Sequence, residues 1–206
     1  MTDGIVRGYD GVSRCWWADS APEYRAYHDC EWGFPVAHDI RLFEKLSLEG
    51  FQAGLSWLTI LRKRENFRRA FAGFDFTVVS RFDEGDVARL LNDASIIRHR
   101  GKIEAVINNA GRAVELVDAE GSLAAYVWRF EPSSRPRRVE RGEVAAETPE
   151  SRALAKDLKR RGWRFVGPTT VYAFMQAMGV VNDHLSGCAA RSPATRARRD
   201  FEVPGA

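Results

Sequence analysis

Two pairs of cysteine and histidine, one near each end of the chain, have the residue types of a metal site. His184 and Cys188 lie four residues apart in the stretch VVNDHLSGCAA, a spacing that places both on one face of a helix. Cys15 and His28 form the second pair. Two thiolates and two imidazoles make the closed, tetrahedral ligand set of a structural zinc ion. Such a site would join the N-terminal segment to the last helix and hold both in place.

The same four residues also have an ordinary interpretation. Cys15 can be a small buried hydrophobic residue, and His28 can be a polar residue that is satisfied within the core. A zinc finger is excluded, because its ligands lie within one short unit and these two pairs are separated by most of the chain. The spacing alone leaves a structural metal site and a metal-free core as alternatives.

Aromatic and acidic residues alternate between positions 15 and 33. The aromatic residues of this span are Trp16, Trp17, Tyr24, Tyr27 and Trp32, and the acids among them are Asp19, Glu23, Asp29 and Glu31. Flat side chains with polar tips suit a pocket that stacks on a planar ring. Ordinary core packing is the alternative. The interleaved carboxylates favour a half-open cleft over a dry core.

Glu49 occupies an unexpected place in the helix predicted from Asp39. It shares a stripe with Leu42, Leu46 and Ala53, so its side chain should point inward. A buried carboxylate is costly unless it is hydrogen-bonded or ion-paired. We therefore expect Glu49 either to form a structural ion pair or to lie at the bottom of the aromatic pocket, where it would accept hydrogen bonds from a ligand.

Basic residues cluster in several short runs, although the formal net charge is only +3. The run SIIRHRGK lies between two amphipathic segments, where Gly101 permits a tight turn and a helix should begin at about Lys102. Free N–H groups at a helix start, together with the charges of Arg98, Arg100 and Lys102, suit a phosphate. This pattern is typical of a helix–hairpin–helix that binds the DNA backbone without reading its sequence. A solvated basic surface is the alternative.

Helical periodicity and end signals predict an all-α class. The expected helices cover 39–54, 56–71, two segments within 85–117, 148–162 and 168–179. We expect a flexible leader over 1–13, one compact domain of two small lobes over 14–188, a mobile loop or linker over 132–147 and a disordered tail over 189–206. The sequence contains neither a signal peptide nor a membrane-spanning apolar run, which predicts a cytoplasmic protein. Three cysteines are too few and too scattered for a disulfide framework.

Taken together, these segments resemble the 3-methyladenine DNA glycosylase I family. The segments that carry the resemblance are RCWW, EYRAYHDCEWG, LFEKLSLEGFQAGLSW, KRENFRRAF, IIRHRGKI, KRRGWRFVG and FMQAMGVVNDHLSGC. They run in family order from Arg14 to Cys188. The resemblance implies a helix–hairpin–helix DNA glycosylase fold with a structural zinc snap that joins the N- and C-terminal segments. It implies one Zn²⁺ per chain, with the ligands Cys15, His28, His184 and Cys188.

The resemblance also assigns roles within the pocket and at the DNA. It implies that Glu49 is the catalytic, base-reading carboxylate and that the base pocket is formed by Trp17, Tyr24, Tyr27, Trp32 and Trp57. DNA-binding roles fall on Gln52, Gly54, Leu55, Arg98, Arg100, Gly101 and Lys102, with Leu55 filling the gap left in the duplex. Two features depart from the family pattern: Phe51 replaces an expected polar residue, and the loop 131–147 is rich in arginine.

The implied activity is base excision repair of alkylation damage. A monomeric, monofunctional enzyme would flip N3-methylated adenine out of double-stranded DNA, hydrolyse its N-glycosidic bond, release free 3-methyladenine and leave an abasic site. A cationic base leaves as a neutral molecule, so no acid is needed, and catalysis would rest on differential binding. One alternative is a non-enzymatic binder of damaged DNA, which would not need Glu49. A zinc-dependent nucleobase deaminase is disfavoured, because the sequence lacks its H-x-E and P-C-x-x-C signature.

Overall fold

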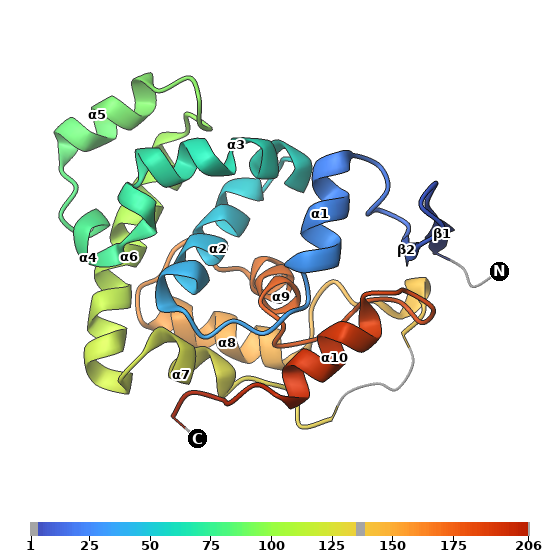
Figure 1. Cartoon of the computed structure of the whole chain (residues 1–206). Coiled ribbons are helices and arrows are strands. Elements are labelled where there is room, and N and C mark those ends of the chain that lie inside the picture. The colour runs from blue at the N-terminus through green and yellow to red at the C-terminus, as the bar shows by residue number, and fades with distance from the viewer. Residues whose placement is uncertain (1–3, 135–138, 206) are drawn as a thin grey trace.

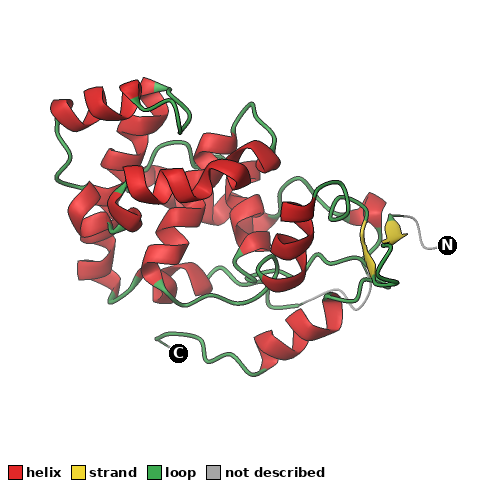
Figure 2. Ribbon diagram, turned by 45° about the horizontal axis from the view of Figure 1, so that its top comes forward, coloured by secondary structure: helices red, strands yellow, loops and turns green. Residues whose placement is uncertain are grey.

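The structure is a computed structural model that describes residues 4–134 and 139–205, and most of these are helical (Figures 1 and 2). The elements in chain order are the strands β1 (Ile5–Arg7) and β2 (Ser13–Cys15), followed by α1 (Pro22–Cys30), α2 (Asp39–Gln52), α3 (Trp57–Ala70), the 3-10 turn η1 (Ala72–Phe74), α4 (Phe76–Val79), α5 (Glu84–Asn92), α6 (Arg100–Glu120), α7 (Leu123–Trp128), the 3-10 turn η2 (Arg141–Glu143), α8 (Pro149–Arg160), α9 (Pro168–Ala177) and α10 (Arg191–Arg199). The predicted, mainly helical class is confirmed.

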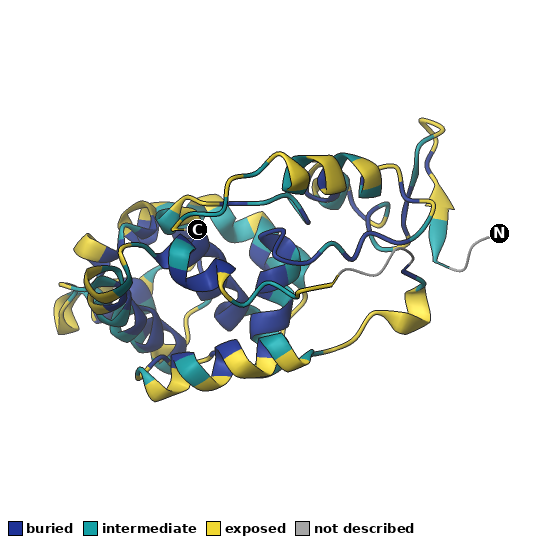
Figure 3. Cartoon of the chain, turned by 90° about the horizontal axis from the view of Figure 1, so that it is seen from below, coloured by how far each residue is buried: buried dark blue, intermediate teal, exposed yellow. Residues whose placement is uncertain are grey.

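Helix α2 lies at the centre of the molecule, with the other helices packed around it (Figure 1). It contacts α3, α6, α7 and α9, and every residue from Leu42 to Phe51 is buried. Buried residues are concentrated along these central helices (Figure 3). A helix that is buried on all sides is normally apolar throughout, yet this segment of α2 carries Glu44, Lys45 and Glu49. The charged side chains of α2 must therefore find partners inside the protein.

Local signals at helix ends act as expected at some helices and not at others. Ser56 caps α3 by accepting a hydrogen bond from the backbone N–H of Thr59 at 3.2 Å, and α8 ends before Gly162, as predicted. Asp39 is the first helical residue of α2 and not its N-cap. Its carboxylate accepts a hydrogen bond from the backbone N–H of Ala124 at 2.9 Å, at the start of α7. It thereby adds to the cap that Ser122 already supplies to α7.

The two helices predicted around a basic turn are α5 and α6, which residues 93–99 connect. Helix α6 begins at Arg100, slightly earlier than the predicted start at Lys102. His99 caps it, because its Nδ1 lies 3.2 Å from the backbone N of Lys102. Gly101 consequently falls in the first turn of α6 rather than in the connecting turn.

Both ends of the chain contain regular structure that their composition did not predict. The segment expected as a flexible leader over 1–13 contains strand β1 and the start of β2, which pair antiparallel. The tail expected as disordered over 189–206 contains α10. After α10 the chain returns to the core, where the Phe201 ring packs 4.6 Å from the ring of Trp128. A polar, arginine-rich composition suggested disorder, but this aromatic contact anchors the tail.

Residues 135–138, within the loop predicted over 132–147, lie outside the described residues. None of the described helices combines the length and the apolar content needed to cross a lipid bilayer.

Gly179 permits a close approach between the end of α9 and the segment that joins α1 to α2. Its φ of +71° lies in the left-handed region. A Cβ at this position would lie 2.4 Å from the carbonyl carbon of Phe34 and 2.5 Å from the nitrogen of Pro35. Backbone atoms cannot rotate aside as a side chain can. The absence of a side chain at Gly179 therefore lets residues 180–190 lie beside the N-terminal third of the chain.

We expect Gly179→Ala to lower the free energy of unfolding by about 2–5 kcal/mol, because left-handed backbone costs about 1–2 kcal/mol and overpacking about 1–3 kcal/mol. Urea denaturation measures the change. Gly111→Ala is the matched control, since it lies within α6 and a Cβ there meets nothing within 4 Å. That control should stabilise by about 0.5–1 kcal/mol. Equal stability of Gly179→Ala and the parent protein would show that the contact is not as close as described.

Candidate active site and metal centre

The four predicted metal ligands form one buried cluster. The ligand atoms of Cys15, His28, His184 and Cys188 all lie within 4.8 Å of one another. His184 Nδ1 lies 3.2 Å from His28 Nε2 and 3.6 Å from Cys188 Sγ, and it lies 4.0 Å from Cys15 Sγ. Tetrahedral zinc, with bonds of about 2.0 Å to nitrogen and 2.3 Å to sulfur, separates its ligand atoms by about 3.3–3.8 Å. The cluster therefore has nearly the dimensions of a closed tetrahedral site.

Each histidine of the cluster is oriented by a second hydrogen bond. His28 Nδ1 lies 2.7 Å from the carboxylate of Asp29, and His184 Nε2 lies 2.9 Å from the backbone oxygen of Trp32. Both bonds place the N–H on the outer nitrogen and leave the inner nitrogen free to bind a metal, as outer partners commonly do. A hydrogen bond from the Cys15 thiol lowers the pKa of the Cys188 thiol, and the thiolate is the form that binds metals.

His184 and Cys188 do not lie on a helix, contrary to the prediction. Residues 182–190 run through turns between α9 and α10, where the backbone N–H of Cys188 donates to the oxygen of Leu185 at 2.9 Å. This turn brings the two side chains together as a helix would. Gly33 approaches from the other side with φ of +82°, and a Cβ there would lie 3.0 Å from the His184 ring.

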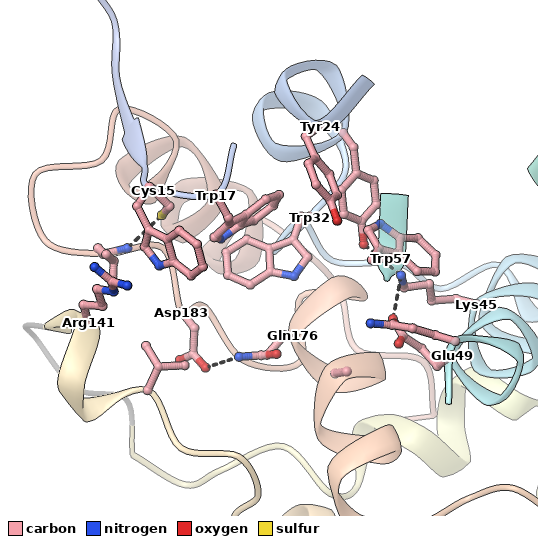
Figure 4. A pocket seen from close by; sticks show the side chains of 16 residues that line it. Cys15, Trp17, Tyr24, Trp32, Lys45, Glu49, Trp57, Arg141, Gln176 and Asp183 are labelled. Atoms are coloured by element: carbon pink, nitrogen blue, oxygen red, sulfur yellow. Dashed lines mark hydrogen bonds and ion pairs between the residues drawn. The ribbon is translucent and has the colours of Figure 1, made fainter. Parts of the chain in front are cut away.

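A cavity of about 470 Å³ lies beside the cluster, and Cys15 borders both (Figure 4). The five aromatic residues predicted for the base pocket, Trp17, Tyr24, Tyr27, Trp32 and Trp57, all line it. Trp17 meets its neighbours edge-on, with its ring centroid 5.5 Å from that of Tyr24 and 5.2 Å from that of Trp32. This size and this aromatic lining are typical of a site for a small planar molecule.

Glu49 and Lys45 form a charged floor on one side of this cavity. Lys45 Nζ lies 2.7 Å from Glu49 Oε1 and donates a hydrogen bond to the Tyr27 hydroxyl at 2.8 Å. It also lies 3.2 Å from the centroid of the Trp57 ring. Each of the two charged residues is only 6% exposed. Glu49 therefore forms an ion pair and also lines the cavity, and its hydrogen bond to a ligand stays a prediction.

Burial shifts the pKa values of the groups on this floor. It lowers the pKa of the Lys45 ammonium, an effect that the negative charge of Glu49 opposes. Burial also raises the pKa of the Tyr27 phenol well above its ordinary value, and the charge of Glu49 adds to that increase. Tyr27 therefore remains a neutral hydroxyl that accepts the hydrogen bond from Lys45.

Sequence reasoning missed several residues of the cavity wall, namely Lys45, Arg141, Gln176 and Asp183. The Arg141 guanidinium stacks 4.6 Å from the ring centroid of Trp16, and Asp183 accepts a hydrogen bond from Gln176 at 2.8 Å. Most of them come from segments far from the N-terminal aromatic cluster, so no local pattern joins them. Lys45 is the exception, because its position four residues before Glu49 on the same helix was a signal for an ion pair.

The loop that joins α2 to α3 is exposed beside the cavity. Gln52 and Trp57, on either side of this loop, line the cavity. Between them, Gly54 is exposed with φ of +81°, and the Leu55 side chain is 41% exposed. The structure therefore places Gln52 at the cavity and leaves Gly54 and Leu55 free to contact a partner.

Lys102 is buried, contrary to the prediction that its charge faces a phosphate. Its ammonium donates hydrogen bonds to the backbone oxygens of Phe51 at 2.9 Å and Ala53 at 2.6 Å. Burial lowers its pKa. A lysine in α6 thus satisfies carbonyl groups at the end of α2 that have no partner within the helix. We correct its role to that of a tether for the exposed loop.

The remaining basic residues of the α5–α6 connection are exposed. Arg100 pairs with Glu84 at 3.3 Å and with Glu104 at 3.1 Å. Arg98 is exposed and makes no hydrogen bond or ion pair with another described residue. Of the three predicted basic contacts, Arg98 is therefore the most available to an anion.

The chain is similar in sequence and in fold to known proteins. The family model described as methyladenine glycosylase matches residues 17–192. DNA-3-methyladenine glycosylase 1 of Escherichia coli (strain K12) is 47% identical over 180 residues, which are 86% of this chain and 96% of that protein. A crystal structure of 3-methyladenine DNA glycosylase I superposes with a TM-score of 0.83 at 47% identity, covering 86% of this chain and 99% of the other. A variant of 3-methyladenine DNA glycosylase I in complex with 3-methyladenine superposes with a TM-score of 0.81 at 33% identity, covering 85% and 95%.

We expect Lys102→Met to lower the free energy of unfolding by about 1.5–3 kcal/mol, because charged hydrogen bonds to buried groups contribute that much. Hydrogen exchange at Gly54, Leu55 and Ser56 should become faster, because the loop loses its tether. Lys156→Met removes an exposed lysine of α8 and should leave both measurements unchanged. Unchanged stability of Lys102→Met, with weaker binding to undamaged DNA, would restore the phosphate-contact role.

Proposed function

The chain belongs to the methyladenine glycosylase family, and we propose that its aromatic cavity receives a 3-methyladenine base flipped out of duplex DNA and severs it from its deoxyribose. The protein is a DNA-3-methyladenine glycosylase, a DNA repair hydrolase that acts on an N-glycosidic bond. The observation that carries this assignment is the combination of aromatic walls with a buried carboxylate, Glu49, at the cavity floor.

The reaction requires little acid–base chemistry from the protein. Methylation at N3 gives the attached adenine a positive charge. When the bond between C1′ and N9 breaks, its electron pair moves onto the base, which leaves neutral, and C1′ becomes electron-poor. Water then adds to C1′ and loses a proton to solvent. An enzyme accelerates this sequence by holding the flipped base in a geometry that favours departure.

The cavity residues supply that binding. Stacking on Trp17, Trp32 and the tyrosines would hold the purine plane. The Glu49 carboxylate would accept a hydrogen bond from the amino edge of the base. The indole N–H of Trp57 is buried without a hydrogen-bond acceptor among the described residues, and a purine carries acceptor nitrogens. Leaving a buried donor unpaired is costly, so a bound base would relieve that cost.

The exposed loop and the α5–α6 connection together form the proposed DNA-binding face of a monomeric enzyme with a helix–hairpin–helix. Leu55 at the loop tip would fill the space that the flipped base leaves in the stack, and Gly54 would allow the chain to approach the duplex closely. Arg98 and Arg100 would contact phosphates without reading sequence. Lys102 would act indirectly by holding the loop, and Gln52 would face the base from within the cavity.

The Cys/His cluster is the proposed site of one structural zinc ion. Its four ligand atoms lie within 4.8 Å of one another, close to tetrahedral separations, and its two outer nitrogens already have partners. Four protein ligands complete a tetrahedral shell, so the ion would hold segments together rather than bind substrate. The residues would clamp the end of β2 and helix α1 to the segment that follows α9.

Freshly purified protein should contain one zinc ion per chain by elemental analysis. Cys188→Ala should abolish stoichiometric zinc and lower the free energy of unfolding, because a closed site that lacks one ligand no longer holds the ion that links the two ends of the chain. Cys30→Ala is the matched control, since Cys30 is exposed and lies outside the cluster. A parent protein that is free of metal and as stable after incubation with a chelator would contradict the proposed ion.

Glu49→Gln should reduce release of 3-methyladenine from methylated duplex DNA by about 10- to 150-fold, the value of a charged hydrogen bond of about 1.5–3 kcal/mol. Free bases released by the parent and the variant can be separated and quantified. The rate is to be expressed per folded molecule, with the melting temperature measured in parallel.

The control for this experiment is Glu44→Gln on the same helix. Glu44 is buried and pairs with Arg68 at 2.7 Å, but it does not line the cavity. Its replacement should cost stability and leave excision nearly normal. Full excision by Glu49→Gln would contradict the role of Glu49 in reading the base. A parent protein that releases no 3-methyladenine would overturn the proposed function as a whole.

A further inference from the structure

Lys45 occupies the two positions in the cavity that would otherwise attract a cation. Its ammonium neutralises the Glu49 carboxylate at 2.7 Å and lies over the Trp57 ring at 3.2 Å from the centroid. On the basis of the proposed function, we propose that Lys45 determines whether the base site prefers a neutral or a cationic base. With the ammonium in place, the site favours the neutral, departed base over the cationic base that is still attached to DNA.

The geometry holds the ammonium on the floor of the cavity. The Tyr27 hydroxyl accepts its hydrogen bond at 2.8 Å, and the rings of Tyr27 and Trp57 pack 5.5 Å apart beside it. Lys45 is 6% exposed, so solvent does little to screen its charge. Figure 4 shows Lys45, Glu49 and Trp57 together on one side of the cavity.

The other charges near this floor largely cancel. Glu31 and Arg64 form a two-bond ion pair, with distances of 2.6 and 2.9 Å. Asp183 and Arg141, which carry opposite charges, lie toward the other side of the cavity (Figure 4). The net charge next to a bound base is therefore decided by Lys45 and Glu49 together, and in the native protein these two sum to zero.

This arrangement acts on the reaction through charge. Before cleavage, the flipped base carries a positive charge, and the ammonium cancels the attraction that the Glu49 carboxylate alone would exert on it. As the C1′–N9 bond breaks, the electron pair moves onto the base and the positive charge moves to C1′, farther from the floor. Without Lys45 the attraction would therefore weaken during the reaction and would stabilise the bound substrate more than the transition state. Glu49 can still accept a hydrogen bond from the neutral base.

Two small probes and four proteins test the proposal. The probes are 3-methyladenine at a pH where it is neutral and 3,9-dimethyladeninium, which is permanently cationic and has a methyl group where the sugar is attached. The proteins are the parent, Lys45→Met, Glu49→Gln and the double variant, whose floors carry net charges of zero, −1, +1 and zero if the retained group stays ionised. For each protein, calorimetry gives the dissociation constant of the neutral base divided by that of the cation. Taking this ratio removes effects that are common to both probes.

We expect the ratio to follow the charge of the floor. Lys45→Met should shift it toward the cation by about 10- to 100-fold, the effect of one charge about 6 Å away at an intermediate dielectric constant. Glu49→Gln should shift it in the opposite direction, and the double variant should return close to the parent. Lys156→Met, which removes an exposed charge from α8, should not change it. On methylated DNA, Lys45→Met should lower KM and kcat together, a pattern that a loss of packing does not produce.

The design also covers a Lys45→Met protein that fails to fold because Glu49 is left without its partner. The double variant has no such unpaired charge. Relative to neutral 3-methyladenine, it should bind the cation more tightly than Glu49→Gln does. Ratios that are equal in all four proteins, with both probes bound, would overturn the role of Lys45 and leave the proposed function intact. A parent protein that binds neither probe would overturn the proposed function, and this inference with it.

Discussion

A helix buried on every side cannot carry a charge without a partner, and α2 carries three charged residues in its buried segment. Glu44 pairs with Arg68 of α3, whereas Lys45 and Glu49 pair with each other. The ammonium of Lys45 also holds the hydroxyl of Tyr27 from α1 and faces the ring of Trp57 from α3. Satisfying one internal charge thus brings three helices together, and the cavity lies where they meet.

The Cys/His cluster forms the other support of the same cavity. Trp32 contributes its ring to the cavity wall and its backbone oxygen to His184. Cys15 belongs to the cluster and to the cavity lining. A change in the cluster would therefore be felt directly at the aromatic wall. Side chains from the two ends of the chain thus support a cavity whose charged floor lies on the central helix.

The chemistry of a cationic leaving base agrees with a site that has no exposed acid on its floor. The bond is weakened by the charge on the base, so the protein needs to recognise shape, stacking and charge more than to transfer a proton. An ion pair at the floor of the cavity meets two requirements, an acceptor for the base and a balanced charge. In the proposed site, Glu49 would offer an acceptor to the amino edge of the base, and Lys45 would prevent that acceptor from holding a cation too tightly. The tether at Lys102 then positions the loop outside the cavity by satisfying carbonyls at the end of the same helix.

The sequence by itself determined the features that depend on neighbours along the chain. Periodicity and end signals placed α3 and α8, the stripe on α2 pointed Glu49 inward, and the paired spacings singled out the four cluster residues. Tertiary structure decided which groups those features would meet. Asp39 adds to the cap of α7, Lys102 turns inward to α2, and the tail folds because Phe201 finds Trp128. The pattern within one helix determines which way each side chain points. Its contact partner belongs to a distant segment of the chain, and only folding brings that segment into place.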